Sequence, residues 1–146
     1  MSGILRQFKG LIWLIVFPAL PLFGQMVPVA PVEDFRMPMF GENGYKVWDL
    51  QGKEGHYVSA DEIKVGGMFL QTFKGDEALS VETTIESSEA TVFVKEHYAK
   101  GDQDILITGT NYIIEGFEWL WNGKNHNVDI GYNVRVTFLG HLALLE

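Results

Sequence analysis

The 146-residue sequence contains no cysteine, which excludes a disulfide scaffold, a thiolate metal site and a cysteine nucleophile. Basic residues are few, since 11 Lys and Arg stand against 19 Asp and Glu, and the formal net charge is −8. Because phosphate neutralisation needs a basic surface, nucleic acid is not an expected partner. The apolar run Gly10–Gly24 is shorter than the roughly 20 residues that span a bilayer as a helix.

Sequence patterns of catalysis and metal binding are also missing. The four histidines, His56, His97, His126 and His141, show no i,i+2 or i,i+4 spacing, and the chain has no HExxH motif. No serine stands in a GxSxG elbow, and the glycines and lysine of 41–46 lack the spacing of a phosphate-binding loop. The sequence therefore predicts a protein that is not an enzyme, with no catalytic residue, no metal and no cofactor.

Glycine and aromatic residues, by contrast, are abundant, at 16 residues and 13%. Apolar and polar residues alternate with a period of two in many short runs, which is typical of β-strands with one buried face. Glycine-rich and Asn-Gly turn signals separate most of these runs. We therefore expect an all-β domain without a helix of consequence. The runs are 46–50, 63–65, 69–73, 81–85, 91–95, 105–107, 112–114, 117–121, 128–130 and 134–138, and the turn signals are 41–44, 59–62, 74–76, 101–102, 109–111 and 122–123.

The N-terminal segment has the composition of a targeting sequence. Two basic residues, Arg6 and Lys9, precede the apolar run, and Pro18 and Pro21 break its helical potential. A basic segment followed by an apolar one is the pattern of a secretory signal peptide. Residues 1–24 are therefore predicted to be a signal peptide or a short retained N-terminal anchor, and either one would export the rest of the chain.

The prolines of the following segment, and its lack of period, predict an extended linker over residues 25–38. The alternating runs all follow it. We therefore expect one domain over residues 39–146.

The order of these runs resembles that of the OstA-like/LptC-type family, the periplasmic lipopolysaccharide-transport β-jellyroll proteins. The similarity covers about residues 39–138. It begins with a glycine turn, an alternating aromatic strand and an acidic turn, and it continues with an Ile-x-Ser-x-x-Ala segment. The matching segments are Phe40–Tyr57, Ile63–Val65, Ile85–Thr91, Ala99–Gly101, Ile105–Gly109 and Asn133–Val136.

The resemblance implies a single open, V-shaped β-jellyroll of antiparallel strands in the periplasm. It further implies an apolar groove that shields the acyl chains of lipopolysaccharide or a similar lipid. Other β-jellyroll transport proteins would be partners through edge-to-edge strand pairing, and the N-terminus would contact the inner membrane if it is retained.

Candidate groove residues are the large apolar members of one strand face. An equally weighted interpretation is that they fill the core of a closed sandwich. The first and last alternating strands are the expected edges. The groove candidates are Trp48, Leu50, Val65, Met68, Leu70, Ile85, Val92, Val94, Ile107, Ile114, Trp119, Val128 and Ile130, and the edge candidates are Lys46, Trp48, Leu50, Val134, Val136 and Phe138.

An alternative function is a secreted β-sandwich module that binds carbohydrate or protein. Trp119 and Trp121 stand beside Asn122, Asn125 and Asn127, and surface aromatics next to amides can stack on sugar rings. Because Trp119 and Trp121 are two residues apart, however, both lie on one strand face and are expected to face the core.

Overall fold

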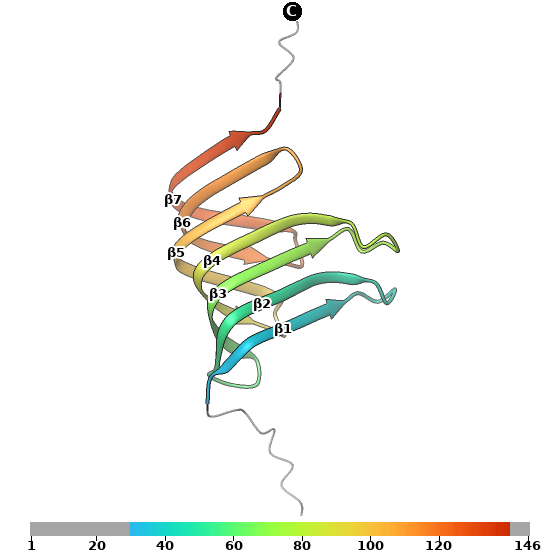
Figure 1. Cartoon of the computed structure of the whole chain (residues 1–146), viewed down its shortest axis with the longest axis vertical. Helices are drawn as coiled ribbons and strands as arrows, with labels where there is room; N and C mark the ends of the chain where they lie inside the picture. Colours follow the sequence, from blue (N-terminus) through green and yellow to red (C-terminus); the bar gives the residue numbers. More distant parts are fainter. Residues whose placement is uncertain (1–29, 141–146) are drawn as a thin grey trace, which may run out of the picture.

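The computed structural model describes residues 30–140, which form seven β-strands and no helix. All neighbouring strands are antiparallel, and they follow one another in sequence order across one open sheet (Figure 1). The predicted all-β fold is therefore confirmed. The strands are β1 (Val32–Phe40), β2 (Lys46–Tyr57), β3 (Glu62–Phe73), β4 (Val81–Phe93), β5 (Tyr98–Thr108), β6 (Tyr112–Asn122) and β7 (Asn127–Phe138).

The predicted signal peptide or anchor, residues 1–24, lies outside the described part of the chain. Among residues 30–140 no helix is long and apolar enough to cross a membrane.

Each strand is folded over near its middle, so the one sheet makes two layers (Figure 1). Residues with positive φ lie within four of the strands: Asp34 (47°), Gly67 (61°), Glu118 (53°) and Asn133 (52°). In β4 and β5 the strand register is interrupted between Glu86 and Thr91 and between Gly101 and Asp104. Such irregularities bend a strand sharply. We call residues 36–40, 46–51, 68–73, 81–86, 104–108, 112–116 and 134–138 the first layer, and 52–57, 62–66, 89–93, 98–101, 117–122 and 127–130 the second.

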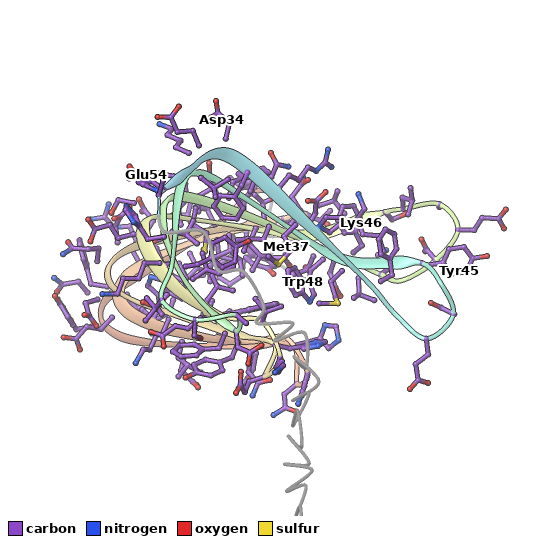
Figure 2. All side chains as sticks on the ribbon, turned by 90° about the horizontal axis from the view of Figure 1, so that it is seen from below. Asp34, Met37, Tyr45, Lys46, Trp48 and Glu54 are labelled. Atoms are coloured by element: carbon purple, nitrogen blue, oxygen red, sulfur yellow. The ribbon has the colours of Figure 1, made fainter. Side chains whose placement is uncertain are left out.

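The two layers enclose the hydrophobic core. Trp48 in the first layer contacts Trp121 in the second edge to face, with ring centroids 6.0 Å apart. Strands β2 and β6 are four positions apart in the sheet, which would separate them by about 19 Å if it were flat. The ring contact is thus made across the interior. Figure 2 shows Met37 and Trp48 between the layers, while Glu54 lies at the bend and Tyr45 at the far end.

The strands are longer than the sequence pattern predicts. The runs 63–65 and 69–73 are two halves of β3, and β4, β6 and β7 each join two predicted runs in the same way. Glycine marks a bend within a strand as readily as a turn between strands. The predicted turn at 101–102 is accordingly wrong, because it is the bend of β5. The turn between β4 and β5 lies at 94–97, so Val94 is not in a strand.

Strand β1 corrects the prediction of a linker over residues 25–38. Residues 32–40 pair with β2 from Val32, opposite Gly55, to Phe40, opposite Lys46. The half-buried Phe35, Met37 and Met39 pack against the core. A proline is tolerated in an edge strand, where one N–H of every two needs no partner, and this allows Pro38 to lie within β1. The sheet therefore begins at Val32 and not at Met39.

A buried carboxylate fastens β1 to its neighbour. Asp49 of β2 has a fully buried side chain and accepts hydrogen bonds from Arg36 Nε of β1 at 3.0 and 2.9 Å. Lys46 Nζ donates to the same carboxylate at 3.1 Å. The hydrogen bond from Arg36, assisted by Lys46, lowers the pKa of Asp49 even though burial opposes this shift.

We expect Asp49→Asn to lower the free energy of unfolding by about 2 kcal/mol at pH 7, the scale of hydrogen bonds to a charged group. Because folding lowers the pKa of Asp49, its contribution is complete above the unfolded pKa of 3.8 and is lost as pH falls through the folded value. Urea unfolding of both proteins between pH 7 and pH 3 measures this. A difference that does not shrink below about pH 4 would contradict the ionic role of Asp49.

Candidate functional site

One continuous row of apolar side chains crosses the interior face of the first layer. Its members lie directly opposite one another, so each strand contributes one side chain to the same face of the sheet. Because the row reaches both edge strands, the apolar interior extends across the whole sheet. The row is Met37, Leu50, Leu70, Ile85, Ile107, Ile114 and Val136.

The second layer faces this row with apolar side chains of its own. Strand pairing places one such side chain on each strand from β2 to β7, and Trp121 of β6 lies directly opposite Val128 of β7. The two rows together form the walls of the interior. The second row is Tyr57, Ile63, Val92, Ala99, Trp121 and Val128.

Exposure along the first row rises toward β7. Leu70 and Ile85 are each 1% exposed, so this part of the interior is sealed. Ile114 on β6 is half-buried, and Val136 on β7 is 48% exposed. The interior is therefore a packed core in the middle of the sheet and an open groove at its β7 end.

A cavity of about 310 Å³ lies at this open end. Its apolar lining comes from both layers, and the polar side chains at its margin include the exposed Glu82 and His126. We call it the β6–β7 groove. Its apolar lining residues are Ile85, Ile107, Tyr112, Ile114, Trp121, Val128 and Ile130.

The structure divides the thirteen groove candidates into two groups. All except Val94 are strand residues that belong to the apolar cluster or pack against it, and Val94 packs against the cluster from its turn. Most of them are nearly inaccessible, and what separates the groups is whether a residue lines the cavity or only fills the core. This core group is Trp48, Leu50, Val65, Met68, Leu70, Val92 and Trp119, and the candidates that line the β6–β7 groove are Ile85, Ile107, Ile114, Val128 and Ile130.

Sequence reasoning missed several interior residues. Ile63 and Ile105 are buried core residues, and Trp121 lines the groove. Their signal was present, because Ile63 alternates with Val65, Ile105 with Ile107, and Trp121 with Trp119. Met37 was missed for another reason, since it lies in the segment interpreted as a linker.

The predicted N-terminal edge is wrong. Lys46, Trp48 and Leu50 belong to β2, which is paired with β1 on one side and β3 on the other. Strand β1 takes the edge because residues 32–40 form a strand. At the other end, Val134, Val136 and Phe138 do lie on an edge strand, since among the described residues β7 pairs only with β6.

The tryptophans proposed for sugar stacking are not on the surface. Trp119 and Trp121 are 3% and 4% exposed, so neither offers a ring face to a sugar in solution. Asn122 has a local role instead, because its side-chain oxygen accepts hydrogen bonds from the backbone N–H groups of Lys124 and Asn125. It therefore shapes the turn between β6 and β7.

Two indole N–H groups are buried without a hydrogen-bond acceptor among the described residues. They belong to Trp48 and Trp119. An unsatisfied buried donor costs about 1–3 kcal/mol. The interior thus contains donors that a water or a ligand oxygen could satisfy.

The hollows on the outer face mix charged and apolar side chains. One of about 700 Å³ over β5 to β7 places Leu106 and Phe117 beside Glu115 and Arg135. A depression of about 490 Å³ over the second layer is lined by side chains of both charges, including Glu54, Lys64, Glu89 and Lys100. No group of three or more His, Asp or Glu side chains in residues 30–140 is placed to hold a metal ion. The β6–β7 groove is therefore the candidate site.

Fold and groove together define a class of protein: a single antiparallel sheet, folded over an apolar interior that opens at one edge strand. The chain matches no protein-family model and no curated protein sequence.

Proposed function

We propose that this protein is a periplasmic lipopolysaccharide-transport protein of the OstA-like/LptC type. The β6–β7 groove shields the acyl chains of lipopolysaccharide or a similar acylated lipid, and the sheet edges join other β-jellyroll transport proteins. Two independent features support this proposal: the order of sequence motifs over residues 39–138, and an apolar interior that opens at one end of the sheet.

The observation that carries the proposal is the exposure gradient along the interior row. A core residue such as Leu70 is sealed, whereas Ile114 and Val136 on the same row remain partly open. Burial of one methylene contributes about 0.8 kcal/mol of favourable free energy. An acyl chain that buries several methylenes in this groove would therefore bind by the sum of these contributions. Because the groove is open along β7, the chain can also leave without unfolding of the sheet.

The polar margin of the groove suits the other end of such a lipid. Glu82 and His126 border the apolar lining and are exposed to solvent. A sugar headgroup hydrogen-bonded to water would remain outside, next to these side chains, while the acyl chains enter between the layers. Glu82 stands at the start of β4 in the first layer and His126 directly before β7 in the second, so this polar margin lies where the strands end, away from the bend.

Export and docking belong to the same proposal. Residues 1–24 would direct the chain across the inner membrane and either be removed or tether it there. Strands β1 and β7 carry backbone groups that pair with no other described strand. A strand from a transport partner can add to such an edge through main-chain hydrogen bonds.

Co-purification tests the proposal. The full chain, extracted from its native envelope in mild detergent, is expected to carry acylated lipid that mass spectrometry identifies. Lipid should be absent from an equally abundant envelope protein purified in the same way. Purified protein without acylated lipid, together with binding on a sugar array, would favour the alternative of a carbohydrate-binding module.

A further inference from the structure

Within residues 30–140, the backbone groups of β7 that have no partner strand belong to the residues that face the interior. Leu139 N donates to Asn111 O at 2.8 Å, so the N–H of Leu139 points toward β6. N–H and C=O directions alternate along a strand, and therefore Val136 and Phe138 direct theirs to the outer edge. Their side chains lie opposite Ile114 and Tyr112 on the interior face.

Strand β1 has the opposite arrangement. Gly41 N donates to Tyr45 O at 2.8 Å, which directs the backbone of Gly41 toward β2. The extra residue of the adjoining bulge lies on β2, since Met39 is opposite Trp48 and Phe40 is opposite Lys46. By alternation the backbone N–H and C=O of Met39 also point toward β2. The backbone of Pro38 therefore faces the free edge, where proline has no N–H to donate.

The number of strands decides which edges can join. With seven antiparallel strands, β1 and β7 run in the same direction, as the arrowheads in Figure 1 show. Head-to-tail stacking of two copies would pair β7 with β1 in parallel and place Pro38 at the junction. Rotation of the second copy about a twofold axis normal to the sheet instead places β7 beside β7, antiparallel, with both apolar interiors on the same side.

We propose that this protein forms a symmetric dimer in which β7 pairs with β7 of a second copy, centred on Val136. In that register Val136 lies opposite its counterpart, and Val134 lies opposite Phe138. These side chains are 52% (Val134), 48% (Val136) and 66% (Phe138) exposed in the single chain. Aromatic and β-branched residues are favourable partners across antiparallel strands. The pairing would continue the interior row, which ends at Val136, from one copy into the other.

Charges on the outer face fit the same register. Arg135 lies opposite Thr137 of the second copy, so no two like charges are directly opposed. Within its own chain, Arg135 is 3.9 Å from Glu115, which offsets the positive charge near the axis. This dimer follows from edge geometry and goes beyond the proposed lipid function, which can fail or succeed without it. Because the dimer occupies β7, it leaves the β1 edge for a transport partner.

Single cysteines test the dimer, because the chain has none of its own. The full chain carrying Val136→Cys, in mild detergent with an oxidant, is expected to form a covalent dimer. Directly paired residues in an antiparallel ladder have Cα atoms about 5.5 Å apart, within disulfide range. Leu79→Cys, on the exposed turn between β3 and β4, is the matched control and should stay monomeric on a non-reducing gel.

Absence of the covalent dimer from a Val136→Cys protein that still reacts with maleimide would overturn the proposal. So would a disulfide between Val136→Cys and Met37→Cys chains mixed together, which reports head-to-tail stacking, or a covalent link to a different protein. Lipid co-purified with the Val136→Cys protein reports the proposed function separately.

A proline variant provides a second test. Val136→Pro removes an N–H that points away from β6, so we expect a monomer by sedimentation. Its urea midpoint should equal that of the unaltered protein at a dilution where both are monomeric. Thr137→Pro removes an N–H that points toward β6 and should lower that midpoint. Persistence of the dimer in Val136→Pro would contradict the proposed pairing.

Discussion

Leu70→Ala is expected to lower the free energy of unfolding by about 2–5 kcal/mol, the range for a leucine truncated in a packed core. Leu70 is 1% exposed and lies between Leu50 and Ile85 in the interior row. The layers are held together by contacts of this kind, and they cannot collapse fully into the space that a missing side chain leaves. Urea unfolding of the two proteins measures the difference.

Leu120→Ala is the matched control. Leu120 lies on the outer face of β6 and is 38% exposed, so the same truncation should cost less than about 1 kcal/mol. Equal losses for Leu70→Ala and Leu120→Ala would show that the folded sheet does not derive its stability from a sealed interior.

Val128→Trp is expected to weaken lipid capture roughly tenfold or more while leaving the protein folded. Val128 is half-buried and lines the β6–β7 groove, where a cavity of about 310 Å³ can take the larger ring. Filling the groove removes the space for an acyl chain, and the loss of two buried methylenes alone is worth about 1.6 kcal/mol. Lipid recovered per mole of protein, quantified by mass spectrometry, measures the effect.

Val58→Trp controls for the added aromatic surface. Val58 lies in the turn between β2 and β3 and is 55% exposed, far along the sheet from the groove. Its substitution should leave lipid recovery unchanged. If Val128→Trp carries as much lipid as the unaltered protein, the acyl chain does not enter this groove.

The strand character of the chain could be read from period-two alternation, because one face of each strand is buried. The joining of short runs into long strands could not. In β3, Gly66 and Gly67 are glycines that fit a turn as well as a bend, and only pairing with β2 and β4 makes them a bend. The same applies to Gly101 in β5. Strand length depends on backbone pairing with distant residues, which local sequence does not record.

The first strand was missed because its local composition opposes the assignment. Pro38 and the neighbouring prolines predict a linker, yet Phe35, Met37 and Met39 alternate in the phase of the interior. The apolar side chains and the bond between Arg36 and Asp49 outweigh the local preference. Once β1 occupies the edge, the predicted edge role of Lys46, Trp48 and Leu50 is lost.

The sequence predicted which strand face lines the candidate site, but not which part of that face is accessible. Alternation identifies which side chains point inward, so Ile85, Ile114 and Ile130 were correctly grouped with Leu50. It contains no information on which of them remain accessible. That depends on the position of the strand in the sheet: Leu50 has neighbours on both sides, whereas Ile130 lies on the edge strand β7.

Site-specific photocrosslinking to lipid in intact cells tests most directly whether acyl chains enter the sheet at its β7 end. A photoreactive side chain at Ile130 faces the groove, and one at the neighbouring Asp129, which is exposed, faces outward. We expect a lipid adduct at Ile130 and little or none at Asp129. No adduct at Ile130, or equal adducts at both positions, would show that acyl chains do not enter the sheet there.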